Sequence, residues 1–474
     1  MRRPTRIALI ATGSLLGLLL LAFLGGSYYV RTDSFRSQLQ AAASRGVGMQ
    51  VSLEGAISVG LFPSPHLNLH DVHVHNRGVE AAVIEKVRIR FRLLYLLRKV
   101  PEIESLVLEH PRILIKKGTD GVLDLVRSTP PVHKRPHGPM EITATDGTVR
   151  YEGDTSGMWV EGEDCEAKAH DLRTEAPDGR PGLQRVSFDG DLSCKEVRTP
   201  KFTATDLKAS IVAAGKGVYT LQPVSLEAFG TKATGSFHAD LGGEQERYSA
   251  SFSVPQLQLS RVFKELGFHQ LAEGQVDAAA DVATSGRTRE ELTKGLSGSV
   301  SLHGKGLTLE GYDLDGELKR FERSQRFDLL DVGAVALAGP LGLVATKGYD
   351  FSRIKGKGGG TSPMHVLVSD WKVDEGVATA EDVAMSTDTH RMALQGKLDL
   401  SAETFDGVVV AVVNAQGCVI AEQKLEGSFR QPKLEKPNVL KALAGPVRRL
   451  VNKGENLLTQ RGCKVFYDGS VKPY

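Results

Sequence analysis

Residues 34–76, SFRSQLQAAASRGVGMQVSLEGAISVGLFPSPHLNLHDVHVHN, decide the fold. The first third of this stretch predicts a short helix, for which either Asp33 or Ser34 can serve as the N-cap. Residues 47–54 then alternate between apolar and polar side chains, and a period of two predicts a half-buried strand. The alternation resumes after a glycine turn and shifts phase at residues 70–71, as a β-bulge would cause. The stretch therefore predicts a helix followed by paired strands.

A long apolar segment precedes this stretch. Residues 7–30 form a run of 24 residues without a charge, and Arg31 ends it. As a helix the run would be about 36 Å long, against about 30 Å for the hydrocarbon core of a bilayer. Its length and its aromatic end favour a retained transmembrane anchor, and a cleaved signal peptide is the alternative. Three arginines lie ahead of the run and predict a cytoplasmic N-terminus, with everything after Val30 on the far side of the membrane.

The composition is that of an ordinary globular protein rich in turns. The chain has 474 residues, 51 of them glycine, with 6% aromatic residues. Its formal net charge of +2, with acidic and basic residues interspersed, argues against nucleic acid as a partner.

The four cysteines fall as two pairs along the chain, Cys165 with Cys194 and Cys418 with Cys463. The chain contains no CxxC motif, so zinc and redox motifs have little support. An even number of cysteines outside the cytoplasm favours one or two local disulfides. Four unpaired buried thiols are the alternative, and sequence alone allows three connectivities.

The clearest alternation in the chain lies between residues 86 and 93. Lysine and arginine occupy one face of this predicted strand. Its other face is apolar and consists of Val87, Ile89, Phe91 and Leu93. Short strands of this kind recur to about residue 413 with few predicted helices between them, and no alternation of strands with helices appears. So many apolar strand faces must be buried from water, and the predicted helices are too few to bury them. A curled sheet could form an open groove in which these faces line the inside and contact acyl chains. An ordinary sandwich core is the alternative.

No motif in the chain predicts catalysis. The sequence has no GxSxG, HExxH or Walker A motif, and its carboxylates form no obvious acid–base pair. Four histidines cluster at His66, His70, His73 and His75. They lack neighbouring cysteines or a matched carboxylate pair in the sequence, so no metal site is predicted. We expect neither an enzyme nor a cofactor.

The order of these segments resembles the AsmA-like proteins of Gram-negative bacteria. The resemblance is carried by residues 51–55 (VSLEG), 67–76 (LNLHDVHVHN) and 106–111 (LVLEHP). In the second half, residues 295–302 (GLSGSVSL) and 394–400 (LQGKLDL) are similar to the C-terminal region of the family.

The resemblance implies an inner-membrane anchor, a periplasmic body and a role in outer-membrane biogenesis. The larger relatives are regarded as phospholipid carriers whose curved β-sheet forms an apolar groove. The expected fold is mainly β with a few helices: an N-terminal transmembrane helix followed by an elongated, curved antiparallel β-sheet that forms an open groove. Its expected parts are a cytoplasmic N-terminus (1–6), an anchor (7–30), a chorein-like αβ segment (31–128), a Pro-rich linker or loop (129–140), an extended sheet with an AsmA-like C-terminal part from about residue 270 (141–435), and an amphipathic helix with a tail (436–474).

Two functions are compatible with these features. The first is binding or transfer of phospholipid along the apolar groove, with Val87, Ile89, Phe91 and Leu93 among the lining residues. The alternative is a non-enzymatic scaffold or assembly factor that influences outer-membrane protein assembly and protein targeting to the membrane. The expected partners are the membrane and phospholipid in the first case, and outer-membrane proteins or envelope assembly factors in the second.

Overall fold

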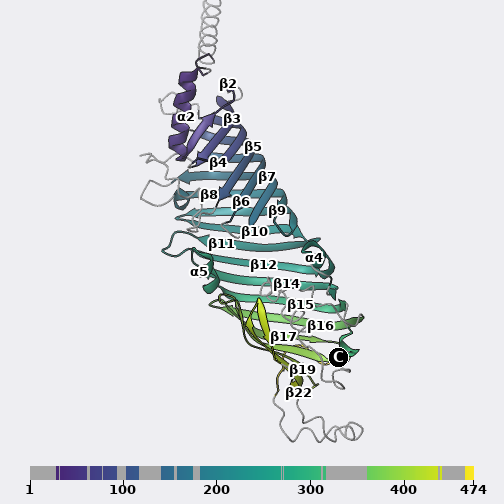
Figure 1. The fold of residues 1–474 in the computed structure, drawn as a ribbon. Coiled ribbons are helices and arrows are strands. Elements are labelled where there is room, and N and C mark those ends of the chain that lie inside the picture. The colour runs from purple at the N-terminus through teal and green to yellow at the C-terminus, as the bar shows by residue number, and fades with distance from the viewer. Residues whose placement is uncertain are drawn as a thin grey trace, which may run out of the picture. The chain divides into compact units, whose positions relative to one another are not determined.

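The computed structural model is mainly β (Figure 1). It divides into two compact units, Met1–Gln222 and Pro223–Tyr474. The described residues are 28–30, 32–60, 64–76, 78–92, 103–116, 140–153, 157–174, 182–267, 270, 272–310, 313–316, 360–435, 438–439 and 465–474. The division falls within strand β10 (Val218–Ala228).

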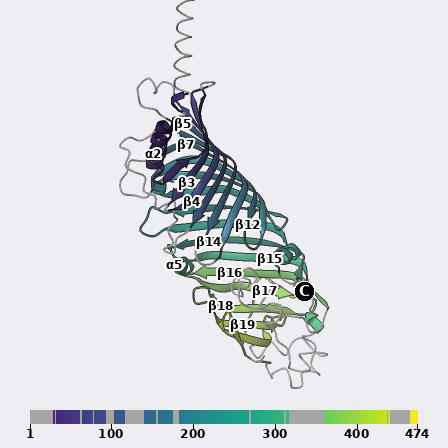
Figure 2. The same cartoon turned by 45° about the horizontal axis from the view of Figure 1, so that its top comes forward.

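The first unit begins with a helix and continues as a sheet. Its elements are α2 (Asp33–Val47), β1 (Gln50–Leu53), β2 (Ile57–Gly60), β3 (His66–Asn76), β4 (Val79–Phe91), β5 (Ile103–Lys116), β6 (Met140–Glu152), β7 (Trp159–Thr174), the 3-10 helix η1 (Gly182–Arg185), β8 (Val186–Arg198) and β9 (Thr203–Gly215). Strands β1 and β2 both pair with β3, and each later strand pairs with the next as far as β9. Figure 2 shows the twist of strands β3 to β7.

Helix α2 is the predicted helix, but its N-cap is Thr32, one residue before Asp33 and two residues before Ser34. Thr32 has an extended backbone, and its hydroxyl accepts a hydrogen bond from the Phe35 N–H at 3.3 Å. Asp33 lies in the first turn, where its charge favours the positive end of the helix. The helix ends at Gly48, which has a φ of 75° and donates its N–H to the Ser44 carbonyl.

One strand pair departs from the predicted antiparallel sheet. Strands β5 and β6 run parallel, with Leu106 opposite Ile142 and Leu108 opposite Ala144. A parallel pair needs a long crossover connection, and more than twenty residues separate the end of β5 from the start of β6. All the other strand pairs described in the two units are antiparallel.

The second unit is also a sheet. Its elements are β11 (Thr231–Asp240), β12 (Arg247–Gln258), α4 (Leu259–Glu265), β13 (Ala272–Glu273), β14 (Gln275–Ser285), α5 (Arg289–Lys294), β15 (Ser297–Glu310), β16 (Thr361–Asp374), β17 (Val377–Ser386), β18 (Arg391–Asp399), β19 (Thr404–Val413), β20 (Val419–Ser428), β21 (Gln431–Leu434) and β22 (Asn438–Val439). The long strands pair in chain order, β13 pairs with β15, and β21 and β22 pair with β20.

Strands β15 to β20 carry most of a large cluster of buried side chains. Trp371, Met385 and Leu398 are almost completely buried within one cluster on one face of the sheet. The Trp371 indole N–H donates to the Ser369 hydroxyl at 2.9 Å, so its polar group is satisfied inside the core.

The C-terminal residues 465–474 cover part of the opposite face of these strands. Tyr467 and Val471 are buried against Ala384 and Ala393. The buried Arg391 guanidinium donates to the Val471 carbonyl at 2.8 Å, which ties the tail to the sheet.

The anchor prediction falls almost entirely outside the described residues. Only Tyr28, Tyr29 and Val30 of the predicted span are described, and no helix within the described ranges has the length and apolar character needed to cross a bilayer. Met140 begins β6, and the remainder of the predicted linker lies outside the description. Of the predicted amphipathic helix, Asn438 and Val439 are described and form strand β22 instead, because they pair with β20.

Candidate functional site: an apolar sheet face

One face of the first unit's sheet is apolar from β3 to β9. Residues that pair across neighbouring strands point to the same face, so the register identifies rows of side chains. Two adjacent rows contain only apolar residues and one glycine. The first row is Leu69, Val87, Leu108, Ala144, Ala167, Leu192 and Ala209. The second row is Leu67, Ile89, Leu106, Ile142, Ala169, Gly190 and Ile211.

The other face of the same strands is predominantly polar. The row between the two apolar rows points the opposite way and consists of Asn68, Arg88, Val107, Thr143, Lys168, Asp191 and Ser210. Its charged groups pair among themselves and with their neighbours: Ser210 donates to Asp191 at 2.9 Å, and Arg88 contacts Glu109 at 3.3 Å. The sheet therefore has one face suited to water and one suited to hydrocarbon.

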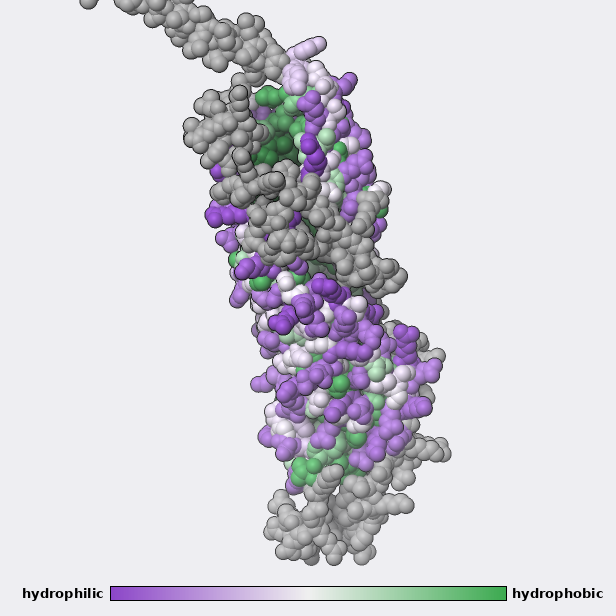
Figure 3. All heavy atoms as spheres, turned by 90° about the vertical axis from the view of Figure 1, so that its left-hand side faces the viewer, coloured by the Kyte–Doolittle hydropathy of each residue, from purple (hydrophilic) through white to green (hydrophobic). Residues whose placement is uncertain are grey.

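The apolar face is covered most completely at its N-terminal end. Phe35, Leu39 and Ala43 of α2 pack against the apolar side chains of β1 to β4, where Val87 is only 6% exposed. Farther along the sheet, Leu108 and Ile211 are only half-buried. Helix α2 is the α-helix that packs on this face. Figure 3 shows a hollow lined by hydrophobic residues, with hydrophilic residues along its right-hand side, at the level of α2 and β3–β5.

The charges on the polar face neutralise one another. Lys86 lies 2.8 Å from Glu109, and the hydrogen bond from Lys86 is the main cause that holds the pKa of Glu109 below its usual value. Arg150 binds both Glu152 and Glu161 at 2.9 Å. Paired in this way, these side chains form a stable solvated surface rather than a concentrated anion-binding patch.

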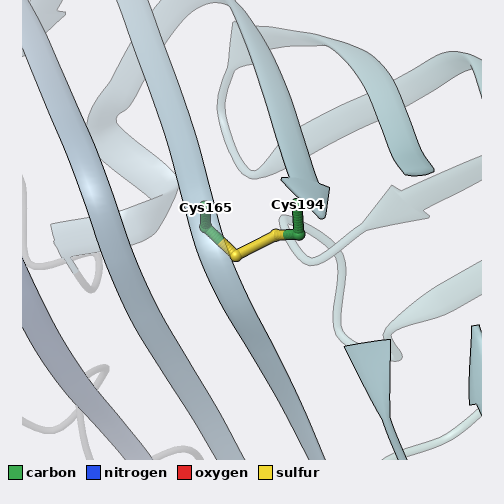
Figure 4. Close-up of a disulfide and its surroundings, with 2 residues drawn as sticks. All are labelled: Cys165 and Cys194. Atoms are coloured by element: carbon green, nitrogen blue, oxygen red, sulfur yellow. A yellow bond between two sulfur atoms is a disulfide. The ribbon is translucent and has the colours of Figure 1, made fainter. Parts of the chain in front are cut away.

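A disulfide crosses the apolar face between β7 and β8. Cys165 and Cys194 are register partners, and they are joined as predicted (Figure 4). Both are buried, at 4% and 6% exposure, next to the apolar row. Cys418 is also disulfide-bonded, and Cys463, the partner predicted for it, lies outside the described residues.

In the second unit, apolar side chains are partly exposed on some strands and buried on others. On β11 and β12 the side chains of Phe237, Ala250 and Phe252 lie on one face, where Phe252 remains 37% exposed. From β15 onward the apolar residues are packed into the core around Trp371. Open apolar surface in this unit therefore lies on its first strands.

Three of the predicted lining residues lie on the apolar face of β4. Val87 and Ile89 occupy the two apolar rows, and Phe91 packs at the edge of the same cluster. Leu93 lies outside the described residues. Their role in lipid binding stays a prediction. The rows contributed by β6 to β9 were not singled out from the sequence, although the alternation of residues 203–213 was a usable signal.

These features define a class of protein: a mainly β chain in whose first unit the sheet has a continuous apolar face on one side and a predominantly polar face on the other. A model of the AsmA family matches residues 1–142 and 144–322, and the chain belongs to this family. The family supports a role in envelope and outer-membrane biogenesis. A search of curated proteins finds no match. The resemblance noted for residues 394–400 lies beyond the matched region.

Proposed function

We propose that the protein is an inner-membrane-anchored periplasmic protein that binds phospholipid through its acyl chains and moves it along the apolar face of the first unit. The observation that carries the proposal is the pair of apolar rows across β3 to β9, opposite a charged face and only partly covered by α2. The chain acts without catalysis in this proposal, because its task is to shield hydrocarbon from water.

The dimensions of the rows suit an acyl chain. Each row crosses seven strands, and six spacings of about 4.8 Å give about 29 Å. One leaflet of a bilayer accounts for about 15 Å of hydrocarbon thickness. Either row is therefore longer than one acyl chain that spans a leaflet.

The chemistry of the rows suits movement as well as binding. Burial of hydrocarbon contributes about 0.8 kcal/mol for each CH₂ group, so a chain of about fifteen carbons gains on the order of 10 kcal/mol. The attraction has no preferred direction, and neighbouring positions in a row of Val, Leu and Ala side chains are chemically alike. A chain can therefore shift along the row without losing its contacts all at once.

Adjacent residues on β5 supply a matched test. Leu108 lies in an apolar row and Val107 lies in the polar row, and both are half-buried. Leu108→Asp places a carboxylate on the proposed lipid surface, whereas Val107→Asp places the same charge at the same level on the other face. The full chain, extracted from a membrane-containing host, is analysed by native mass spectrometry and lipid extraction, with circular dichroism as the check of folding.

We expect phospholipid on the unmodified chain and on Val107→Asp, and several-fold less on folded Leu108→Asp. Ile211→Asp against Val212→Asp repeats the comparison on β9, where the two side chains also point to opposite faces. A folded, unmodified chain without lipid would contradict the proposal and favour the scaffold function, in which the protein acts on outer-membrane protein assembly through protein contacts.

A further inference from the structure

A cluster of histidine and carboxylate side chains lies on the polar face of the first unit, away from the proposed lipid surface. Ser52 of β1 pairs with His73 of β3, so both side chains point to this face. The neighbouring residues Leu53 and Val72 point the other way and are buried in the apolar cluster. The histidine cluster and the apolar cluster therefore lie on opposite faces of the sheet.

Three potential ligands converge in the cluster. Each of Glu54, Asp71 and His73 offers one ligand atom, and these atoms all lie within 4.8 Å of one another. The Nε2 atom of His73 is 3.2 Å from Asp71 Oδ1 and 3.9 Å from Glu54 Oε2. One imidazole nitrogen and two carboxylate oxygens form a donor set that Zn²⁺ and related cations accept, with water completing the coordination.

A fourth residue fixes the orientation of the histidine ring. Glu80 Oε1 lies 2.6 Å from His73 Nδ1, on the side of the ring away from the other two carboxylates. A proton on Nδ1 donated to Glu80 leaves Nε2 as the nitrogen that faces Asp71 and Glu54. A carboxylate that holds the second nitrogen of a ligating histidine is a recurrent feature of metal sites, because it sets the tautomer and the ring orientation.

The backbone holds the ligands in place. The Glu54 N–H donates to the Asp71 carbonyl at 3.0 Å, which brings the two acidic residues together. Arg36 of α2 donates to the carbonyls of Leu53 and Gly55, on either side of Glu54. The site is thus built from α2, β1, β3 and β4 rather than from one flexible loop.

The charge of the cluster favours a cation. Glu54, Asp71 and Glu80 bring three carboxylates to one imidazole ring. The nearby Lys86 and Arg88 are bound to Glu109. His73 is only 18% exposed, whereas the Glu54 and Asp71 side chains are 62% and 55% exposed, so a cation could enter from solvent.

We propose that Glu54, Asp71 and His73 bind one divalent transition-metal cation, with Glu80 as the positioning residue for His73. The four histidines alone did not predict a site, because the ligand Glu54 follows β1 and the positioning residue Glu80 lies on β4, so only Asp71 is next to the histidines in sequence. The ligand class is a borderline cation such as Zn²⁺, which accepts both imidazole and carboxylate ligands.

The test is isothermal titration of Zn²⁺ into the full-length chain, purified without a histidine tag and freed of metal with a chelator. We expect one Zn²⁺ per chain and the loss of this binding in His73→Gln. Asp71→Asn should weaken binding as well, and asparagine suits the φ of 55° at this position. Glu80→Gln should keep the stoichiometry and weaken the affinity about 10- to 100-fold.

His303→Gln is the matched control. His303 Nε2 lies 2.7 Å from Asp370 Oδ1, and within the described part of the chain the group of Glu54, Asp71 and His73 is the only one with three converging ligands. The control should therefore bind Zn²⁺ as the unmodified chain does. Absence of Zn²⁺ binding, or binding that folded His73→Gln retains in full, would overturn the site. An affinity unchanged by Glu80→Gln would overturn the positioning role of Glu80.

Discussion

Removal of the Cys165–Cys194 disulfide should destabilise the first unit alone. The bond joins register partners on β7 and β8, both within that unit. The variant is Cys165→Ala with Cys194→Ala, because alanine leaves no unsatisfied hydroxyl on the buried apolar face.

The expected loss follows from the loop that the bond closes. The two cysteines are separated by 29 residues in sequence. In the chain-entropy account, closing a loop of that length lowers the entropy of the unfolded chain by about 12 cal/mol/K, which is about 3.6 kcal/mol at 25 °C. The figure corresponds to a change of roughly 400-fold in the equilibrium between the folded and unfolded unit.

The two tryptophans of the chain allow each unit to be followed separately. Trp159 begins β7 in the first unit, and Trp371 lies in the core of the second. Urea unfolding is recorded by fluorescence in Trp371→Phe and Trp159→Phe backgrounds, each with and without the two cysteine substitutions. We expect the Trp159 transition to move to lower urea and the Trp371 transition to stay in place. An unchanged Trp159 transition, or equal shifts of both, would refute the reasoning.

Three further outcomes are expected. Thr32→Ala removes the hydroxyl that accepts the Phe35 N–H and should cost about 1 kcal/mol, measured as faster amide exchange in α2; unchanged exchange would contradict the cap. Leu398→Ala should destabilise the second unit by about 2–5 kcal/mol in the same Trp371 unfolding assay, because Leu398 is 2% exposed; a smaller loss would mean that the core collapses around the site. Burial acts to raise the pKa of Asp382, but hydrogen bonds from Ser470 and Tyr467 outweigh it and hold the pKa below the usual 3.8. The resulting stability is present above pH 3.8 and is lost as pH falls through the folded pKa, so the tail should become accessible to an acid protease in that range. If cleavage of the tail in Asp382→Asn depends on pH as strongly as it does in the unmodified chain, this role of Asp382 is contradicted.

Local patterns in the sequence predicted the elements that local interactions determine. The alternation of Val87 and Ile89 with charged residues identified the apolar face of β4, and its buried and half-buried side chains confirm it. The phase shift at residues 70–71 is also confirmed, since Leu69 and Val72 are both buried and Asp71 has a φ of 55°. Side-chain spacing along one strand carries this information.

Pairing between distant strands was harder to predict. Proline is rarely found in the middle of a sheet strand, yet β5 continues through Pro111. Pro111 lies opposite Ile84 of β4, and His110 adopts a φ of 51° that carries the chain past the proline. The parallel pairing of β5 with β6 depends on where the connection between them returns, which the local pattern does not encode.

The candidate sites show the same limit. The sequence showed His73 within a cluster of histidines but predicted no metal site, because Glu54 and Glu80 come from outside β3. It identified the apolar face of β4 but not the rows that continue it through β6 to β9, because a row becomes visible only when the register is known.

The central claim is that hydrocarbon lies against one face of the first unit's sheet. The most direct measurement replaces Ile211 and, separately, its neighbour Val212 with a photo-crosslinking amino acid in the full chain in living cells. Ile211 belongs to an apolar row, whereas Val212 is 47% exposed on the opposite face. The account predicts phospholipid crosslinked at position 211 and not at position 212. Crosslinks to protein alone at position 211, or equal lipid crosslinking at both positions, would contradict it.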